Sequence, residues 1–166
     1  NGSITSGFTV KAGGSIWVKG FIEGAMVVSG EDITVRGGIK TGLKGVVSAA
    51  RNITARFVEN SRLEAGQDII IQEAILQSSI SAGGNVCVTG PRATIAGGNI
   101  QAGQMVEAKI IGSQLGAQTV CEVGTNPKLR AEYKALNQRQ KQMQKEFDNI
   151  SSSLRSIRQN LLHLDS

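Results

Sequence analysis

The sequence has few aromatic residues, prolines, cysteines and histidines, and it contains no long apolar run. Aromatic residues make up 4% of the 166 residues, and only 2 are prolines. A hydrophobic core must therefore be built from aliphatic side chains. No run of about 18 consecutive apolar residues occurs, so no transmembrane helix is predicted. The opening NGSITSGF lacks a basic segment followed by an apolar one, so no secretory signal is expected there.

The usual catalytic and metal-binding residues are scarce. Cys87 and Cys121 are the only cysteines, and neither has the spacing of a metal or redox motif, which predicts two reduced thiols in a cytosolic protein. The single histidine, His163, lies in the leucine-rich C-terminal stretch, where we expect it to flank a coiled coil. No catalytic triad or carboxylate pair can be assembled. We therefore predict no enzyme, no cofactor and no metal.

The net charge of +5 is concentrated in the C-terminal part. Residues 127–166 hold eight Lys and Arg against four Asp and Glu, whereas the preceding 126 residues hold ten against nine. This excess is small and mixed in sign, and no aromatic residues are interleaved with it. Nucleic-acid binding is therefore not expected.

The chain repeats one short pattern, in which a turn rich in small or polar residues is followed by alternating apolar residues. Examples are KAGGSIWVKG (11–20) and SAGGNVCVTG (81–90). Alternation at period two indicates strands. The apolar residue after each such turn recurs at spacings of 17, 20, 16, 17 and 14 residues. This set is Ile16, Ile33, Ile53, Ile69, Val86 and Ile100. Five or six residues earlier stand Val10, Val28, Val47, Leu63, Ile80 and Ile95.

A unit of this length cannot bury its own apolar face, but stacked units can. The sequence therefore predicts an all-β solenoid, a parallel β-helix of about six coils over residues 1–125. Its core contains the ladder Ile16–Ile33–Ile53–Ile69–Val86, and Trp17, Thr34, Thr54, Ile70 and Cys87 point outward. Further apolar positions follow at Ile22, Ile39, Phe57 or Val58, and Ile75. We favour a right-handed β-helix because it accommodates unequal coil lengths more easily.

An acyltransferase on a left-handed β-helix is the enzyme alternative for such an architecture. Those enzymes use a histidine from the coils as a general base. Residues 1–126 contain no histidine, and the repeat does not run in strict hexapeptides. This alternative is therefore disfavoured.

Glycine and Asx residues are expected at the corners of the coils. Glycine pairs at 13–14, 37–38, 83–84 and 97–98 are predicted to supply corners with positive φ. Asp32 and Asp68 share one corner position with Asn52, Asn85 and Asn99. Two aspartates two coils apart cannot supply the oxygen ligands that calcium needs. We therefore interpret these residues as structural corner residues.

The stretch GGIKTGLKG (37–45) is predicted to form a bulged corner loop. It resembles a phosphate-binding loop only superficially, because the G-x-x-x-x-G-K-[ST] spacing and a following helix are both missing. Phosphate binding is not expected.

Lys19, Arg36 and Arg56 fall on one outward position of successive coils. Two interpretations remain open for this basic ladder. It is either a solvated face balanced by nearby glutamates or a docking strip for an acidic partner.

The pattern changes completely after VGTNP (123–127), and residues 126–166 are predicted to form a long coiled-coil helix. Asn126 followed by Pro127 is a helix-start signal. Apolar residues then recur at steps of four and three, interrupted only by Gln140. The predicted seam contains Leu129, Tyr133, Leu136, Met143, Phe147, Ile150, Leu154, Ile157 and Leu161, and it continues to Leu164.

A seam this narrow needs a partner helix. The partner comes either from another copy of the chain or from a second helix after residue 166. In the first case this chain forms a homo-oligomer. In either case Gln140 helps to set the register at some cost in stability.

Several stretches resemble the flagellar assembly protein A (FapA) family of bacteria, long catalogued as a domain of unknown function. They occur in the order of that family and cover nearly all of the chain. Examples are AGGSIWVKGFIEGA (12–25), ITARFVENS (53–61), AGQDIII (65–71), IAGGNIQAG (95–103) and VGTNPKL (123–129).

The resemblance implies a β-helix interrupted by a helical hairpin, of which this chain contains the first helix. It also implies a role in flagellar assembly or placement and supplies no catalytic residues. Residues 1–125 are then the β-helix and residues 126–166 a truncated hairpin. We accordingly expect a cytoplasmic, non-enzymatic scaffold that binds proteins. The alternative is a general self-assembling scaffold similar to bactofilins or to the C-terminal domain of MinC.

Overall fold

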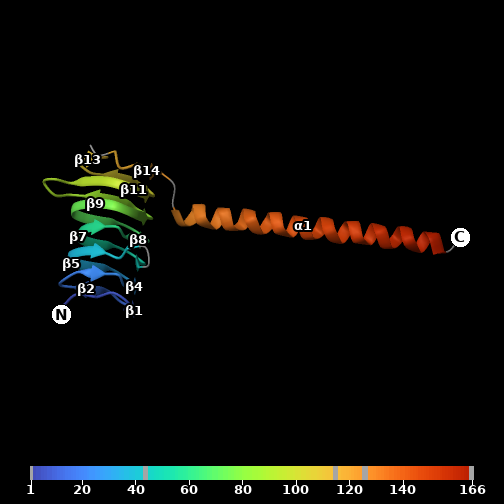
Figure 1. Cartoon of the computed structure of the whole chain (residues 1–166), viewed down its shortest axis with the longest axis horizontal. Helices are drawn as coiled ribbons and strands as arrows, with labels where there is room; N and C mark the ends of the chain where they lie inside the picture. Colours follow the sequence, from blue (N-terminus) through green and yellow to red (C-terminus); the bar gives the residue numbers. More distant parts are fainter. Residues whose placement is uncertain (1, 43–44, 114–115, 125–126, 165–166) are drawn as a thin grey trace. The chain divides into compact units, whose positions relative to one another are not determined.

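The computed structural model describes residues 2–42, 45–113, 116–124 and 127–164 (Figure 1). The chain divides into two compact units, Asn1–Pro127 and Lys128–Ser166. The first unit is a stack of β-strands, and the second is a single helix.

The first unit is a β-solenoid in which all strand pairs are parallel, as Figure 1 shows for the stacked arrows. Each turn contributes to three faces. The first face contains β1 (Thr9–Ala12), β4 (Met26–Ser29), β6 (Val46–Ala49), β8 (Arg62–Ala65), the last parts of β9 (Ile69–Ala82) and β11 (Thr94–Ala102), and β14 (Thr119–Val123). Long strands such as β9 run through the corners and join the faces into one continuous sheet.

The second and third faces share several of these long strands. The second face contains β2 (Ile16–Val18), the first parts of β5 (Ile33–Lys40), β7 (Ile53–Glu59) and β9, then β10 (Asn85–Val88) and β12 (Met105–Glu107). The third face contains β3 (Ile22–Glu23), later parts of β5, β7 and β9, the first part of β11, and β13 (Ile110–Ile111).

Three ladders of inward, mostly aliphatic side chains run along the solenoid, and their middle members form the core. The first is Val10, Val27, Val47, Leu63, Ile80, Ile100 and Cys121. The second is Ile16, Ile33, Ile53, Ile69, Val86 and Val106. The third is Ile4, Ile22, Ile39, Val58, Ile75, Ile95 and Ile111. The solenoid thus has about seven turns rather than the expected six.

The members in the middle of each ladder are fully buried. Ile33, Ile53 and Ile69 are each 0% exposed. Removing such a side chain from water contributes roughly 1.5–3 kcal/mol. Because each side chain packs on its counterpart in the next turn, this contribution depends on correct stacking rather than on any single turn.

The register confirms the predicted ladder Ile16–Ile33–Ile53–Ile69–Val86 and the outward positions that follow it. The register also shows which of the two candidate residues in β7, Phe57 or Val58, points inward. Val58 is 0% exposed and points inward, whereas Phe57 is half-buried on the outside.

Three assignments from the sequence are wrong in register. Ile100 pairs with Ile80 of the first face instead of continuing the ladder of Val86. Ile95 belongs to the third face, where it pairs with Ile75. Val28 is an outward residue, and its neighbour Val27 is the buried one. The physical reason is that all three faces use the same alternating aliphatic pattern, so spacing alone does not identify the face.

The prediction that the glycine pairs supply corners with positive φ is also largely wrong. Among the four predicted glycine pairs, only Gly97 and Gly98 have positive φ. Glycine at position 83 is needed for a different reason, because a Cβ there would overlap the carbonyl oxygen of Gly66 in the turn below. Positive φ instead recurs at the corner between the third and first faces. There it is found at Gly7, Gly24, Gly42, Asn60, Gln77 and Gly97.

Hydroxyl groups satisfy the backbone at this same corner. Ser61 Oγ accepts a hydrogen bond of 2.8 Å from the Thr41 amide, and Ser78 Oγ accepts one of 3.1 Å from the Ser61 amide. Thr119 Oγ1 does the same for the Gly97 amide at 2.8 Å. At the sharp corner these amides are not hydrogen-bonded within the strand ladder. The hydroxyl groups of a neighbouring turn provide the missing acceptors.

The GGIKTGLKG stretch is strand for much of its length. β5 continues to Lys40, and the register shift that corresponds to the expected bulge lies between Val35 and Gly38. Residues 43 and 44 of the predicted corner loop lie outside the described residues. The loop prediction is therefore wrong for residues 37–40, which extend the third face.

The second unit is one helix, α1 (Pro127–Leu164), of 38 residues. Its sequence contains no glycine, and it is rich in Lys, Gln, Glu, Arg and Leu, all of which favour a helix. Pro127 occupies its first position, where the missing amide hydrogen costs nothing. The predicted cap Asn126 lies outside the described residues. The helical tail is confirmed, and the coiled coil stays a prediction.

Gln77 is a strained member of the positive-φ corner, with φ of 44°. We expect Gln77→Gly to raise the free energy of unfolding by about 1 kcal/mol, because glycine removes the left-handed penalty. Urea unfolding followed by circular dichroism measures this change.

Gln77→Ala is the matched control, because it shortens the side chain and keeps the strain. Asn60→Gly should stabilise less than Gln77→Gly, since asparagine tolerates this conformation. A Gln77→Gly variant less stable than the wild type would contradict the strain argument.

Candidate interaction surfaces

The predicted Asx corner forms a continuous hydrogen-bonded ladder along the second face. Asp32 Oδ1 accepts bonds from the amide and the side chain of Asn52 at 3.1 and 3.0 Å. Asn52 Oδ1 accepts from the Asp68 amide at 3.1 Å. Asp68 Oδ1 in turn accepts from the amide and side chain of Asn85 at 2.7 and 3.0 Å.

One side-chain oxygen each of Asp32, Asn52 and Asp68 is thus an acceptor between turns. Asp32 also lies 3.2 Å from the guanidinium of Arg51, which reaches Glu31 at 3.3 Å. Within the described part of the chain, no group of three or more His, Cys, Asp or Glu side chains is placed to hold a metal. Asn99 was expected in this ladder, but it pairs with Ser79 on the first face instead. The hydrogen bonds of these corner residues hold successive turns together.

The two cysteines lie on different faces and are both free. Cys87 points outward from β10, whereas Cys121 belongs to the inward ladder of the last turn. Burial raises the pKa of the Cys87 thiol, and the carboxylates of Glu107 and Asp68 raise it further. Burial likewise raises the pKa of the Cys121 thiol. Neither site favours the reactive thiolate.

The three residues of the basic ladder follow equivalent positions of β2, β5 and β7, because Val18, Val35 and Ala55 are paired in register. All three side chains are exposed. Arg56 forms an ion pair with Glu73 at 2.7 Å, whereas Lys19 and Arg36 pair with no acidic side chain in the described ranges. The structure therefore leaves two uncompensated cations on this face.

An aromatic cluster at the neighbouring corner was not identified from the sequence. The rings of Phe21 and Phe57 lie 6.3 Å apart, and the Lys40 ammonium lies 5.6 Å from the centre of the Phe57 ring. Lys40 also pairs with Glu59 at 2.7 Å. Phe57 covers Gly38, where a Cβ would overlap its ring. The sequence pattern bears on this cluster only where it leaves open whether Phe57 or Val58 occupies the apolar position.

The helix presents its apolar seam to solvent. Its described members are between 56% and 69% exposed, namely Leu129, Tyr133, Leu136, Met143, Phe147, Ile150, Leu154 and Ile157. The side chain of Leu161, a further predicted member, lies outside the described side chains. The helix thus carries a long stripe of large apolar side chains that are exposed to solvent.

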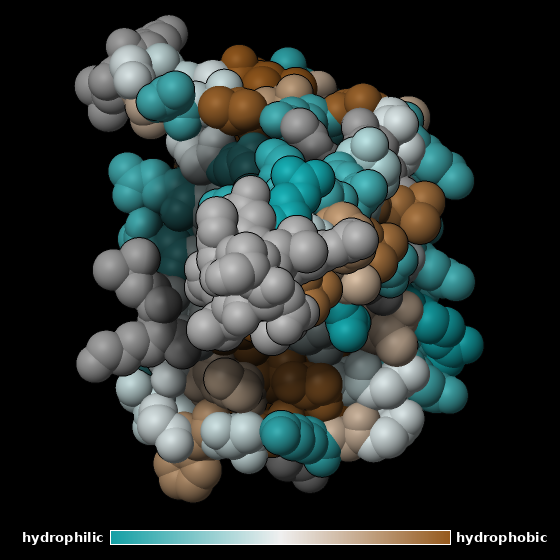
Figure 2. Space-filling view, turned by 90° about the vertical axis from the view of Figure 1, so that its right-hand side faces the viewer, coloured by the Kyte–Doolittle hydropathy of each residue, from teal (hydrophilic) through white to brown (hydrophobic). Residues whose placement is uncertain are grey.

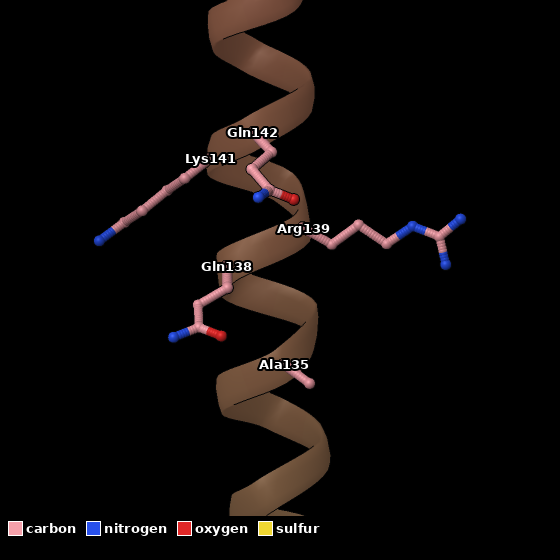
Figure 3. A pocket seen from close by; sticks show the side chains of 5 residues that line it. All are labelled: Ala135, Gln138, Arg139, Lys141 and Gln142. Carbon is pink, nitrogen blue, oxygen red and sulfur yellow. The ribbon is translucent and has the colours of Figure 1, made fainter.

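The hollows on this helix do not form an enclosed site. Figure 3 shows one of them, lined by Ala135, Gln138, Arg139, Lys141 and Gln142, and all five side chains come from one helix. A second, more apolar hollow lies along the seam between Leu136 and Phe147. In the parts of the chain that the structure describes, no helix is long and apolar enough to cross a membrane.

Comparisons with known proteins identify one family. The family described as the Flagellar Assembly Protein A beta solenoid domain matches residues 1–163, which is nearly the whole chain. Comparisons with curated proteins and with solved structures return no match.

Asp68 tests the structural role of the Asx ladder. We expect Asp68→Ala to lower the free energy of unfolding by about 1–3 kcal/mol, because the Asn85 amide and side chain lose their acceptor. Asp68→Asn keeps an oxygen at that position and should cost much less. Thermal unfolding with and without calcium measures both effects, and a large stabilisation by calcium would contradict the structural role.

The raised thiol pKa values have a kinetic consequence. At neutral pH both thiols should react with iodoacetamide more slowly than a cysteine in an unfolded peptide, because less thiolate is present. The rate should rise with pH, and its midpoint should lie above that of the peptide. Mass spectrometry after timed labelling measures both rates. Labelling faster than the peptide would overturn this expectation.

Proposed function

The chain belongs to the flagellar assembly protein A β-solenoid family, and from this premise we propose that it is a non-enzymatic scaffold in bacterial flagellar assembly or placement. The family match supports the link to flagella. The exposed seam of α1 carries the proposal that the chain works by binding proteins. Two free thiols suit a reducing compartment, and we place the scaffold in the cytoplasm.

The seam binds a partner helix as a coiled coil in this proposal. Exposed apolar side chains of this size are costly in water, and only a second helix with the same periodicity covers such a narrow stripe along its length. The partner is another copy of the chain or a second helix beyond residue 166. In the first case this chain forms a homo-oligomer.

The polar member of the seam supports a defined register. Gln140 occupies one apolar position between Leu136 and Met143, and it is exposed like its neighbours. A polar residue at one such position disfavours registers that place it against an apolar side chain. The proposal therefore includes a fixed alignment of the two helices.

The basic ladder is a second binding surface in this proposal. Lys19 and Arg36 lie on adjacent turns of a parallel face, where strands are spaced at about 4.8 Å. An acidic segment laid across these turns would neutralise both cations. Arg56 contributes less because Glu73 already compensates it.

The alternative is a general self-assembling scaffold without a flagellar role. The observation that favours it is the pair of solenoid ends, at which strands β1, β2, β12, β13 and β14 each pair on one side only among the described residues. Unpaired strand edges are templates for further pairing.

A deletion strain decides between these two functions. We expect removal of the gene for the full-length protein to give missing, supernumerary or misplaced flagella, which a complementing copy restores. Flagella are counted by electron microscopy. Normal flagella in the deletion strain would contradict the flagellar role and favour the general scaffold.

Charged substitutions in the seam test the coiled coil. We expect Phe147→Asp or Leu154→Asp to reduce the mass of the particle in solution and its helical content, because a carboxylate cannot be buried in an apolar interface. Sedimentation and circular dichroism measure the two effects.

Gln142→Asp is the matched control, because it introduces the same charge outside the seam. It should leave the mass and the helicity unchanged. Seam variants that keep the wild-type mass and helicity would show that the seam does not pair with another copy of the chain.

A further inference from the structure

Most cations in the middle of the solenoid are balanced by a carboxylate. Figure 2 shows hydrophilic side chains at many levels of the stack. In the described ranges 31–42 and 45–73, every Lys and Arg except Arg36 has an acidic oxygen within 3.3 Å. The balanced cations are Lys40, Arg51, Arg56 and Arg62. Arg36 differs from them, because its exposed side chain has no acidic partner in the part of the chain that the structure describes.

Arg36 and Lys19 stand side by side on neighbouring turns. The residues before them are paired in register, and directly after them the Gly37 amide donates a hydrogen bond of 3.0 Å to the Gly20 carbonyl. Arg56 lies on the other side of Arg36, one turn further along the stack. Like charges at adjacent strand positions oppose pairing. This column of cations is therefore unfavourable in the isolated chain, and an anionic partner would relieve the repulsion.

The column faces sideways from the stack, and its central member has a strand on either side. Arg36 lies in β5, which pairs with both β2 and β7. Beside Lys19, the corner is covered by the preceding layer, because the Phe21 amide donates a hydrogen bond of 3.0 Å to Ser3 Oγ. The exposure of Arg36 therefore comes from its outward position in the middle of a sheet.

An aromatic ring adjoins the column at the same corner. Phe21 is 44% exposed and lies two residues after Lys19. Its ring is held against the ring of Phe57 at 6.3 Å. A partner bound to the cations can thus place an apolar side chain on Phe21.

We propose that this column binds an acidic α-helix of a partner protein, which lies along the stacking axis with two carboxylates facing Lys19 and Arg36. This inference rests on the basic ladder acting as a binding surface, as in the proposed function, and it adds the kind of partner. Neighbouring strands are about 4.8 Å apart, whereas side chains on one side of an extended segment are about 6.7 Å apart. Residues i and i+3 of a helix share a face and differ in height by about 4.5 Å. The spacing of the cations therefore matches a helix.

Glu73 limits the number of carboxylates that the column accepts. A third acidic residue of the helix, at i+6 or i+7, would reach the level of Arg56. Glu73 already balances Arg56 at 2.7 Å and would repel that residue. The partner helix therefore has carboxylates at i and i+3, an uncharged residue at the third level, and an apolar side chain that contacts Phe21.

The test uses the full chain carrying Phe147→Asp, so that the helix seam does not compete for the probe. The probe is a fluorescein-labelled, alanine-based helical peptide with glutamates at i and i+3 and a leucine at i+4. A second peptide of the same composition has its glutamates at i and i+2, which do not share a face. We expect the first peptide to bind about fivefold more tightly at low salt, because it presents both carboxylates to the cations. Fluorescence anisotropy measures both affinities.

Substitutions on the solenoid locate the binding surface. Arg36→Gln and Lys19→Gln should each weaken binding of the first peptide about fivefold. Arg62→Gln is the matched control, because it removes the same charge on the first face, and it should leave the affinity unchanged. Circular dichroism verifies that each variant is folded.

The limit set by Glu73 is tested with a third peptide, which carries an additional glutamate at i+7. Glu73→Gln frees Arg56 and should strengthen binding of this peptide about fivefold. Glu64→Gln removes the same charge and frees Arg62 on the first face, so it should have no effect. Equal effects of the two substitutions would show that only the net charge of the chain matters.

The outcomes separate this inference from the proposed function. Equal binding of the first two peptides would overturn the helical partner and leave the acidic docking strip standing. Binding of neither peptide would overturn both, and the flagellar role and the seam would be unaffected. An effect of Arg62→Gln as large as that of Arg36→Gln, or displacement of the peptide by an oligo(dT) strand of equal charge, would reduce the binding to general attraction of polyanions and also overturn the inference.

Discussion

Every turn of this solenoid must present the same cross-section as its neighbours. An isoleucine such as Ile53 is fully buried only because Ile33 and Ile69 lie directly on either side of it. A turn with a different inward side chain would leave a cavity or a clash in both adjacent turns. The stacking of equal residues is thus the constraint on which the corners, the polar ladder and the outer faces all depend.

The corners show how the chain meets this constraint with backbone and side-chain hydrogen bonds. Ser61 and Ser78 accept amide protons from the preceding turn, and Asp68 does so for the following one. The glycine at position 83 allows backbone to approach backbone where a Cβ would not fit. These polar groups therefore have a structural role, which is to hold neighbouring turns together.

The regions that stacking leaves uncovered are the ones suited to binding. Inside the solenoid each ladder residue has neighbours above and below. The helix has an apolar seam with no interior of its own to face. Binding is therefore expected along this seam, as proposed for a scaffold.

The sequence by itself determined the class of fold, the helical tail and most of the second-face ladder. Apolar residues alternate with a period of two between the small residues, and they recur with a period of 3.5 after Pro127. Both periods are properties of the local sequence, so they can be interpreted without knowledge of tertiary contacts. The tertiary structure decided which face each aliphatic residue joins, as it did for Ile95, Ile100 and the choice between Val27 and Val28. It also decided where positive φ falls, because Asn60 and Gln77 adopt it only when the stacked turns impose the corner on them. The aromatic cluster of Phe21, Phe57 and Lys40 depends on contacts between turns that sequence spacing does not contain.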